Sequence, residues 1–230
     1  MVPTVKLEKI GDRTAMLIQR FDRYWDLPDA PPVHAGAATL ALSNSGSGRI
    51  EKRLAFISGL TLLGCHEADS MTKSYGDLAN AIRKYCHPEV VVADNKDLYR
   101  RMIYNIFVTN NDDHLRNHGF VWDAKHLGWR LSPLYDVTPN TSFAQDRYLH
   151  LSAGPNGKHA HLDNALAAHS WFRLSEKAAA EVIAQVWEKV REWKVSFEAS
   201  GVPEDQIEKV TTAFRHIDEV TSTEVRRKIA

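Results

Sequence analysis

The longest regular pattern in the sequence is an apolar stripe that recurs at helical spacing between residues 175 and 200. Apolar side chains three or four residues apart lie on one face of a helix, so the stripe predicts a long amphipathic helix packed against a core. Gly201 and Pro203 follow directly and are expected to end this helix. The stripe consists of Ala178, Val182, Val186, Val190, Trp193 and Phe197. A stripe of this length constrains the chain to a largely helical fold.

Other stretches show the same period. The pattern turns helical from about Leu54, and the capping-box pair Ser74 and Asp77 predicts a helix start. A further helix is expected from about Asn95 to Thr109, and a last helical pair over 207–217. The helices beyond residue 175 carry no polar clusters at special spacing, so we expect them to form the scaffold of the core.

Short extended stretches interrupt the helical pattern at two places. Gly11-Asp12 lies between two of them within residues 4–21, which predicts a hairpin. Two more, HGFVW and GWRLS, are joined by five residues and predict a second hairpin over 118–131. The predicted fold class is therefore mainly α with a few short β-strands (α+β).

The stretch between residues 26 and 49 is polar and rich in Pro, Gly and Ser, which predicts a long connector. Its Gly46-Ser47-Gly48 follows no strand and precedes no Gly-Lys-Ser/Thr, so it does not read as a phosphate loop. The predicted division is a small β element with its connector over 1–50 and a helical domain over 51–230.

Charge and composition exclude several functional classes. Lys plus Arg and Asp plus Glu both number 29 among 230 residues, and zero net charge argues against direct binding of nucleic acid or an anionic membrane. Two cysteines are too few for a disulfide framework. The sequence contains no run of 18 apolar residues and no apolar leader at its start. These features predict a cytoplasmic protein.

The segment NNDDHLRNH, over 110–118, concentrates Asn, Asp and His between a predicted helix and a predicted strand. Asp112 and Asn117 are five residues apart, as are the catalytic Asp and the metal-binding Asn of the protein-kinase catalytic loop. Asp136 follows the next hairpin, where a kinase carries its second metal-holding Asp. Phosphoryl transfer needs a carboxylate that accepts the proton of the attacking hydroxyl and oxygen ligands for Mg²⁺. These three residues supply both.

Other interpretations of these residues remain open. Clustered Asn and Asp can form a turn held by its own side chains. His114 and His118, with Asp112, could bind a transition metal, although a loop lacks the helical register that brings such a pair together. Three further histidines, at 150, 159 and 161, lie in a Gly- and Asn-containing loop and are predicted to belong to a mobile segment.

The sequence around this constellation strongly resembles a known family. NDDHLRNHGF at 111–120, followed by WRLSPLYD at 129–136, resembles the C-terminal kinase lobe of HipA-type serine/threonine kinases, the toxins of bacterial toxin–antitoxin modules. The segments TLLG at 61–64 and SYGDL at 74–78 also look like family segments. The resemblance covers most of residues 14–220, and the order D-x-H-x-x-N followed by Y-D is its specific part.

The resemblance implies a protein-kinase-like fold and assigns roles to the constellation. Asp112 would be the catalytic carboxylate, and Asn117 and Asp136 would be Mg²⁺ ligands. His114 falls on the motif's histidine and would orient the loop rather than transfer protons. Asp113 misses the motif spacing by one residue and would act through its neighbours. The implied cofactors are ATP and Mg²⁺.

The segment LIQRFDR at 17–23 looks like the family's E-R-F-D-R hinge, where Gln19, Phe21 and Asp22 would hold the adenine. Gln19 replaces the family's acid, but an adenine contact through backbone groups would survive this change. The family's Gly-rich loop and nucleotide-binding Lys should lie several tens of residues upstream, whereas Lys6 and Lys9 are too close to the hinge. We therefore expect most of the N-terminal lobe to be lacking.

Two functions follow from the resemblance. The first is an ATP-dependent serine/threonine protein kinase of the toxin–antitoxin type, which a separately encoded N-lobe could complete. The second is a catalytically weak or inactive kinase remnant that acts as a binding module. The family implies a protein substrate, with aminoacyl-tRNA synthetases as the class, and an antitoxin or N-lobe protein as partner.

Overall fold

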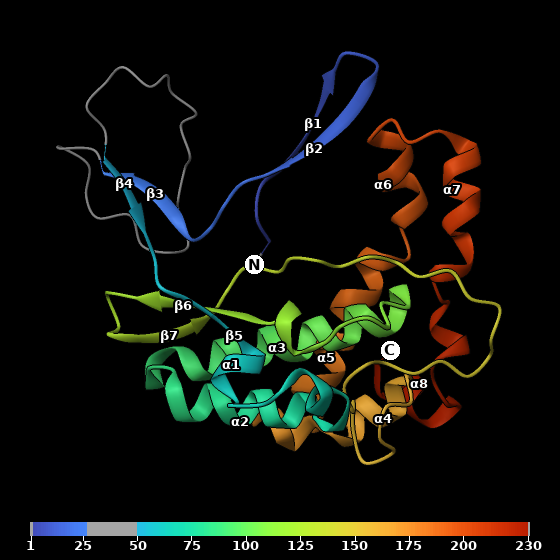
Figure 1. The fold of residues 1–230 in the computed structure, drawn as a ribbon. Helices are drawn as coiled ribbons and strands as arrows, with labels where there is room; N and C mark the ends of the chain where they lie inside the picture. The colour runs from blue at the N-terminus through green and yellow to red at the C-terminus, as the bar shows by residue number, and fades with distance from the viewer. Residues whose placement is uncertain (1, 27–49, 230) are drawn as a thin grey trace.

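The computed structural model describes residues 2–26 and 50–229 (Figure 1). Helices are the main regular structure in this part of the chain and strands are few and short, so the predicted mainly α fold is confirmed. The α-helices are α1 Gly59–Leu62, α2 Tyr75–Tyr85, α3 Pro88–Val108, α4 Leu162–Ala167, α5 Glu176–Val190, α6 Trp193–Ala199, α7 Glu204–Val210 and α8 Thr223–Ile229. Short 3₁₀ turns lie at Glu67–Thr72, Leu115–Asn117, His169–Phe172, Thr211–Ala213 and Ile217–Glu219. In these two ranges no helix is both long and apolar enough to span a membrane.

The described strands form small antiparallel sheets. They are β1 Val5–Ile10, β2 Arg13–Ile18, β3 Arg23–Asp26, β4 Ile50–Arg53, β5 Phe56–Ser58, β6 Gly119–Asp123 and β7 Gly128–Leu131. β1 pairs with β2, β3 with β4, and β5, β6 and β7 form one sheet in that order. Both predicted hairpins are confirmed, and Gly11 takes the positive φ of 60° that the first turn requires. The predicted connector and its Gly46-Ser47-Gly48 lie outside the described residues.

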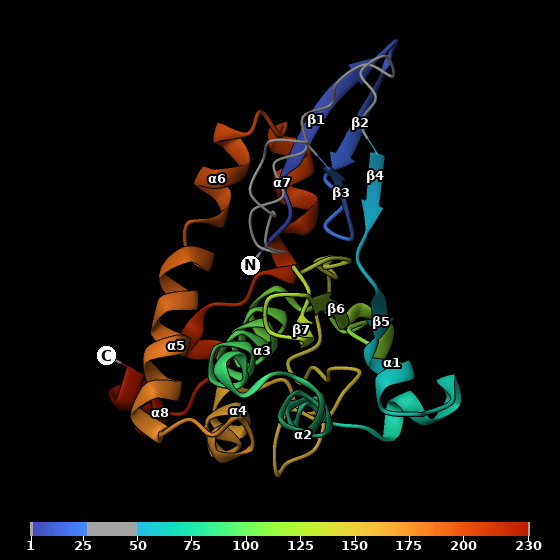
Figure 2. The same ribbon diagram turned by 90° about the vertical axis from the view of Figure 1, so that its left-hand side faces the viewer.

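Helix α3 is the centre of the body, with α2, α5 and β7 packed around it (Figures 1 and 2). Its side chains Leu98, Met102 and Phe107 are fully buried. The helix predicted from Asn95 in fact begins at Pro88, one turn or more earlier. A proline fits the first turn of a helix, where its missing N–H needs no partner, so this residue marks the start.

The stretch from Leu54 was expected to be helical, but Phe56–Ser58 is strand β5. Phe56 pairs with Val121 of β6, and this non-local pairing fixes the extended conformation. A short apolar run cannot be assigned to helix or strand from its period alone. Ser58 then caps α1, accepting a hydrogen bond from the N–H of Thr61.

The long helix predicted over 175–200 is two helices, α5 and α6, separated at Arg191 and Glu192. Glu192 leaves the helical conformation with ψ of 15°. Trp193, the first residue of α6, stacks on Phe214 with ring centroids 4.0 Å apart. The apolar stripe is therefore divided between the main core and a second aromatic cluster, a division that its unbroken period does not reveal.

The loop that carries His150, His159 and His161 was expected to be mobile, but it packs onto the body. Its Leu149 and Leu151 are buried, and the rings of His159 and His161 stack 5.3 Å apart. His150 hydrogen-bonds through Nε2 to the hydroxyl of a buried serine, at 3.0 Å. These contacts assign the loop to the folded core rather than to a loose surface segment.

Candidate active site

The Asn- and Asp-rich loop lies between the end of α3 and the start of β6. Thr109 ends α3 in the left-handed conformation, with φ of 54°, and turns the chain out of the helix. The N–H of Leu115 donates to Ser70 Oγ at 3.3 Å, and the N–H of Gly59 donates to the carbonyl of His118 at 2.6 Å. The loop is thus attached to the body at its start, middle and end.

Asp112 and Asn117 contact each other within this loop. The buried Asn117 donates Nδ2 to the backbone carbonyl of Asp112 at 3.0 Å. This bond fixes the amide, so Oδ1 is the atom that can ligate a cation. The Asp112 side chain is exposed, and the N–H of His114 donates to the same carbonyl at 2.9 Å. An accessible carboxylate therefore lies next to an oriented amide.

Asp136 follows β7 in a segment that is bonded to the same loop. The preceding Tyr135 donates its hydroxyl to the carbonyl of Arg116 at 2.5 Å, and Asn140 donates Nδ2 to Asn111 Oδ1 at 2.6 Å. Burial raises the pKa of Tyr135 to about 12, so this hydroxyl keeps its proton. Asp136 is exposed and adopts φ of 55°, a conformation that is uncommon for residues other than glycine and recurs at functional sites.

Asp113 and His118 are not part of the exposed group formed by the Asp112 and Asp136 carboxylates. His118 Nε2 lies 3.1 Å from Asp113 Oδ2, and both side chains are buried. Burial alone would raise the pKa of Asp113, but the charge and hydrogen bond of His118, the hydrogen bond of Tyr75 and the charge of Arg101 together lower that pKa. His118 is thus paired with the buried Asp113, which does not support a transition-metal site made of His114, His118 and Asp112. In the described ranges no cluster of three or more His, Cys, Asp or Glu side chains could hold a metal ion.

His114, within the loop, is half-buried. Its Nδ1 is buried without a hydrogen-bond partner in the described part of the chain, and its ring lies edge-on to His150 at 5.8 Å. Burial, followed by the charges of Lys158 and His114, lowers the pKa of His150, which favours its neutral form. Ser70 links His150 to the loop and was missed at the sequence level, because no local pattern connects positions 80 residues apart.

The hinge-like residues lie near the tyrosine that precedes Asp136. The ring of Phe21 is 5.8 Å from that of Tyr135, centroid to centroid. Asp22 accepts a hydrogen bond from Arg20 Nε at 2.8 Å, and this bond lowers the pKa of Asp22. The backbone N–H of Gln19 donates to the carbonyl of Thr4 at 2.9 Å. The aromatic contact therefore joins the hinge-like segment to the segment that carries Asp136.

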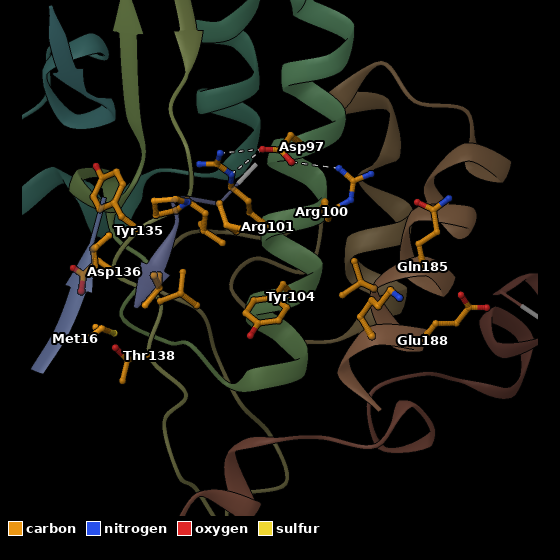
Figure 3. Close-up of a pocket in the computed structure, with 18 residues that line it drawn as sticks. Met16, Asp97, Arg100, Arg101, Tyr104, Tyr135, Asp136, Thr138, Gln185 and Glu188 are labelled. Atoms are coloured by element: carbon orange, nitrogen blue, oxygen red, sulfur yellow. Dashed lines mark hydrogen bonds and ion pairs between the residues drawn. The ribbon is translucent and has the colours of Figure 1, made fainter. Parts of the chain in front are cut away.

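A pocket of about 1250 Å³ lies between the β1–β2 hairpin, α3, α5 and the segment after β7 (Figure 3). Figure 3 shows Tyr135, Asp136 and Met16 on one side of it, Gln185 and Glu188 on the opposite side, and Tyr104 on the wall between these two groups. Asp136 lines this pocket, but Asp112 and Asn117 do not. The proposed adenine-binding residues, Gln19, Phe21 and Asp22, do not line it either. The pocket is therefore a separate hollow that meets the constellation only at Asp136.

The constellation fits a Mg²⁺–nucleotide site in its chemistry. Mg²⁺ prefers oxygen ligands, retains several waters, and is commonly bound through one or two carboxylates together with substrate phosphates. Asp136 offers an exposed carboxylate, and Asn117 offers an amide oxygen whose orientation is fixed. The absence of a third carboxylate from this group leaves room for phosphate oxygens without excess negative charge.

Comparisons with known proteins identify the family and the fold of the chain. The family model of the HipA-like C-terminal domain matches residues 1–194. A curated Haemophilus influenzae protein named "Putative kinase" is 38% identical over 63 residues, which span 27% of this chain and 18% of that protein. A chain from the Shewanella oneidensis structure of the toxin–antitoxin system HipA, HipB and operator DNA matches with a TM-score of 0.59 at 15% identity.

That structural match covers 99% of this chain and 49% of the solved chain, so the protein spans about half the length of the solved relative. At this identity the match establishes the fold, and the family assignment rests on the family model, which covers most of the sequence. The chain belongs to the HipA-like C-terminal domain family.

Proposed function

We propose that this chain is the catalytic lobe of a HipA-like, ATP-dependent serine/threonine protein kinase. The observation that carries the proposal is the pair of hydrogen bonds, Tyr135 to Arg116 and Asn140 to Asn111, that joins the segment of Asp136 to the loop. Through these bonds, two segments that supply acidic and amide oxygens lie side by side. Phosphoryl transfer depends mainly on such positioning and on electrostatic stabilisation.

In this proposal Asp112 orients the substrate hydroxyl and accepts its proton, because its carboxylate is exposed at the loop surface. Asn117 Oδ1 and the Asp136 carboxylate hold Mg²⁺, which when bound neutralises charge on the phosphates. Gln19, Phe21 and Asp22 form the hinge against which the adenine lies. His114 keeps the loop in place through its packing on the ring of His150.

The substrate and partner proposals rest on family membership. We propose a protein hydroxyl as the acceptor, with aminoacyl-tRNA synthetases as the class that the family implies. The Shewanella structure contains HipB and operator DNA together with HipA. We therefore propose an antitoxin as a partner of this chain, with any contact with DNA made through such a complex.

A second candidate is a lobe with little activity of its own, which needs a separately encoded N-lobe. The inner face of the β1–β2 hairpin supports it, because Val5, Met16 and Ile18 line the pocket yet remain 51%, 61% and 48% exposed. A two-stranded hairpin is marginally stable alone, and an apolar patch of this kind marks an interaction site. We propose that residues 1–50 belong with such an N-lobe and that 51–230 form the helical lobe.

Calorimetry with the isolated chain tests both candidates. We expect Mg-ATP to bind with a Kd of about 1 mM or weaker, because the residues assigned above include few phosphate donors, and we expect binding to require Mg²⁺. Asp136→Asn should abolish the heat of Mg-ATP binding. Asp205→Asn changes an exposed carboxylate on α7 and should leave that heat unchanged. Binding that is unaffected by chelating Mg²⁺ would contradict the kinase assignment. Submicromolar affinity would contradict the need for an N-lobe.

A further inference from the structure

A group of buried polar side chains lies directly beneath the Asp112 loop and takes no part in the chemistry proposed above. Asp113 Oδ2 accepts hydrogen bonds from the hydroxyl of Tyr75 on α2, from Asn105 Nδ2 on α3 at 2.6 Å, and from His118 Nε2 at 3.1 Å. Because a carboxylate only accepts, each of these three atoms must be the donor. All four side chains are at most 2% exposed.

The group is closed by further contacts among its members. Asn105 Nδ2 also donates to the hydroxyl oxygen of Tyr75 at 3.0 Å, and the rings of Tyr75 and His118 meet edge to face at 5.6 Å. Asn110 donates Nδ2 to Asn105 Oδ1 at 3.1 Å. Asn105 therefore contacts the loop on both sides of Asp112, once at Asn110 and once at Asp113.

This arrangement restricts the conformations that the loop can adopt. A buried carboxylate that loses its hydrogen bonds is strongly disfavoured, so any loop conformation that withdraws Asp113 from its three donors is costly. Asp113 is flanked in the chain by Asp112 and His114, and its attachment fixes the backbone on which both are carried. The carbonyl of Asp112, to which Asn117 donates, belongs to the peptide bond that joins Asp112 to Asp113.

We propose that Asp113 is a positioning residue, which Tyr75, Asn105 and His118 hold so that Asp112 and Asn117 keep the geometry needed to bind Mg-ATP. It cannot touch substrate or metal, because it is buried beneath the loop. This inference rests on the proposed kinase function and adds the element that maintains its site.

The test compares two changes that each remove one buried tyrosine hydroxyl. Tyr75→Phe deletes a donor to Asp113, whereas Tyr99→Phe deletes a hydroxyl that donates to the carbonyl of Ala165, away from the loop. Both side chains are fully buried, so the two variants should lose similar stability. Two quantities are measured on the whole chain: hydrogen exchange of the amides of residues 111–118, and the Kd for Mg-ATP by calorimetry.

Tyr75→Phe is expected to speed exchange in the loop and to raise the Kd for Mg-ATP by about tenfold, as losses of supporting partners at metal sites do. Tyr99→Phe should change neither quantity. Asp113→Asn should speed loop exchange and raise the Kd for Mg-ATP more strongly than Tyr75→Phe does. If Asp113→Asn fails to fold, the comparison of Tyr75→Phe with Tyr99→Phe still tests the inference.

Unchanged loop exchange in Tyr75→Phe would overturn the inference and leave the kinase proposal intact. Faster exchange with an unchanged Kd would also overturn it, because the network would then stabilise the loop without serving the site. If the native chain bound no Mg-ATP at all, the proposed function would fail and the positioning role would fail with it. Hydrogen exchange of residues 111–118 would still show in that case whether the network stabilises the loop.

Discussion

Asp112→Asn is expected to lower the turnover of the protein, measured together with a HipA-type N-lobe polypeptide, by about 10²–10⁴-fold. An amide has nearly the shape of a carboxylate but cannot accept the proton of the attacking hydroxyl. The Asn117 bond to position 112 uses the backbone carbonyl, which the substitution retains, so the loop should keep its geometry. Binding of Mg-ATP should therefore change little while phosphoryl transfer nearly stops.

The measurement is the transfer of the labelled γ-phosphoryl group from ATP to a protein acceptor at saturating Mg-ATP. Asp146→Asn is a suitable control, because it neutralises an exposed carboxylate that contacts His159 rather than the loop. The control should retain full turnover. If Asp112→Asn retained the complemented activity, the catalytic assignment would be wrong even though the chain belongs to a kinase-related family.

Supplying the N-lobe polypeptide is expected to raise the turnover of the isolated chain by about 10²-fold or more, which corresponds to roughly 2.7 kcal/mol in the barrier. Much of a kinase's rate comes from cations and backbone donors fixed around the transferring phosphoryl group. The residues assigned here provide a carboxylate and two Mg²⁺ ligands, which can hold a metal but clamp a nucleotide poorly.

Two adjacent positions on β2 form a matched pair for testing where the N-lobe docks. Met16 lies on the inner, pocket-facing side of the hairpin, whereas Leu17 points to the opposite side because successive strand residues alternate. Met16→Glu should remove most of the gain in turnover, and Leu17→Glu should preserve it. Equal gains in both variants would show that the N-lobe does not use this face, and full turnover by the chain alone would show that no N-lobe is needed.

The elements nearest the proposed site were predictable from sequence because their signals are local. The hairpin over 118–131 follows from two short extended stretches on either side of a short polar turn. The spacing from Asp112 to Asn117 and then to Asp136 can be read directly from the sequence. The start of α3 was missed although Pro88 marks it, because the apolar period begins later than the helix.

The remaining features depend on contacts between distant positions. Tyr75 and Asp113 are 38 residues apart and meet only because α2 packs against α3 beneath the loop. Strand β5 is extended because it pairs with β6. The helical stripe is interrupted after α5, and Trp193 at the start of α6 stacks on Phe214. No local period encodes such partners, so the sequence indicates the exposed chemistry of the loop but not the buried network that supports it.

Paramagnetic broadening tests most directly whether the loop and the segment after β7 form one Mg-ATP site. Mn²⁺ takes the same oxygen ligands as Mg²⁺ and broadens NMR signals of nearby nuclei. Adding Mn²⁺ with ATP to the ¹⁵N-labelled chain should broaden the amides of residues 111–117 and 135–137 and spare those of α8, and Asp136→Asn should abolish the effect. Broadening centred elsewhere, or unchanged in Asp136→Asn, would contradict the assignment of this site.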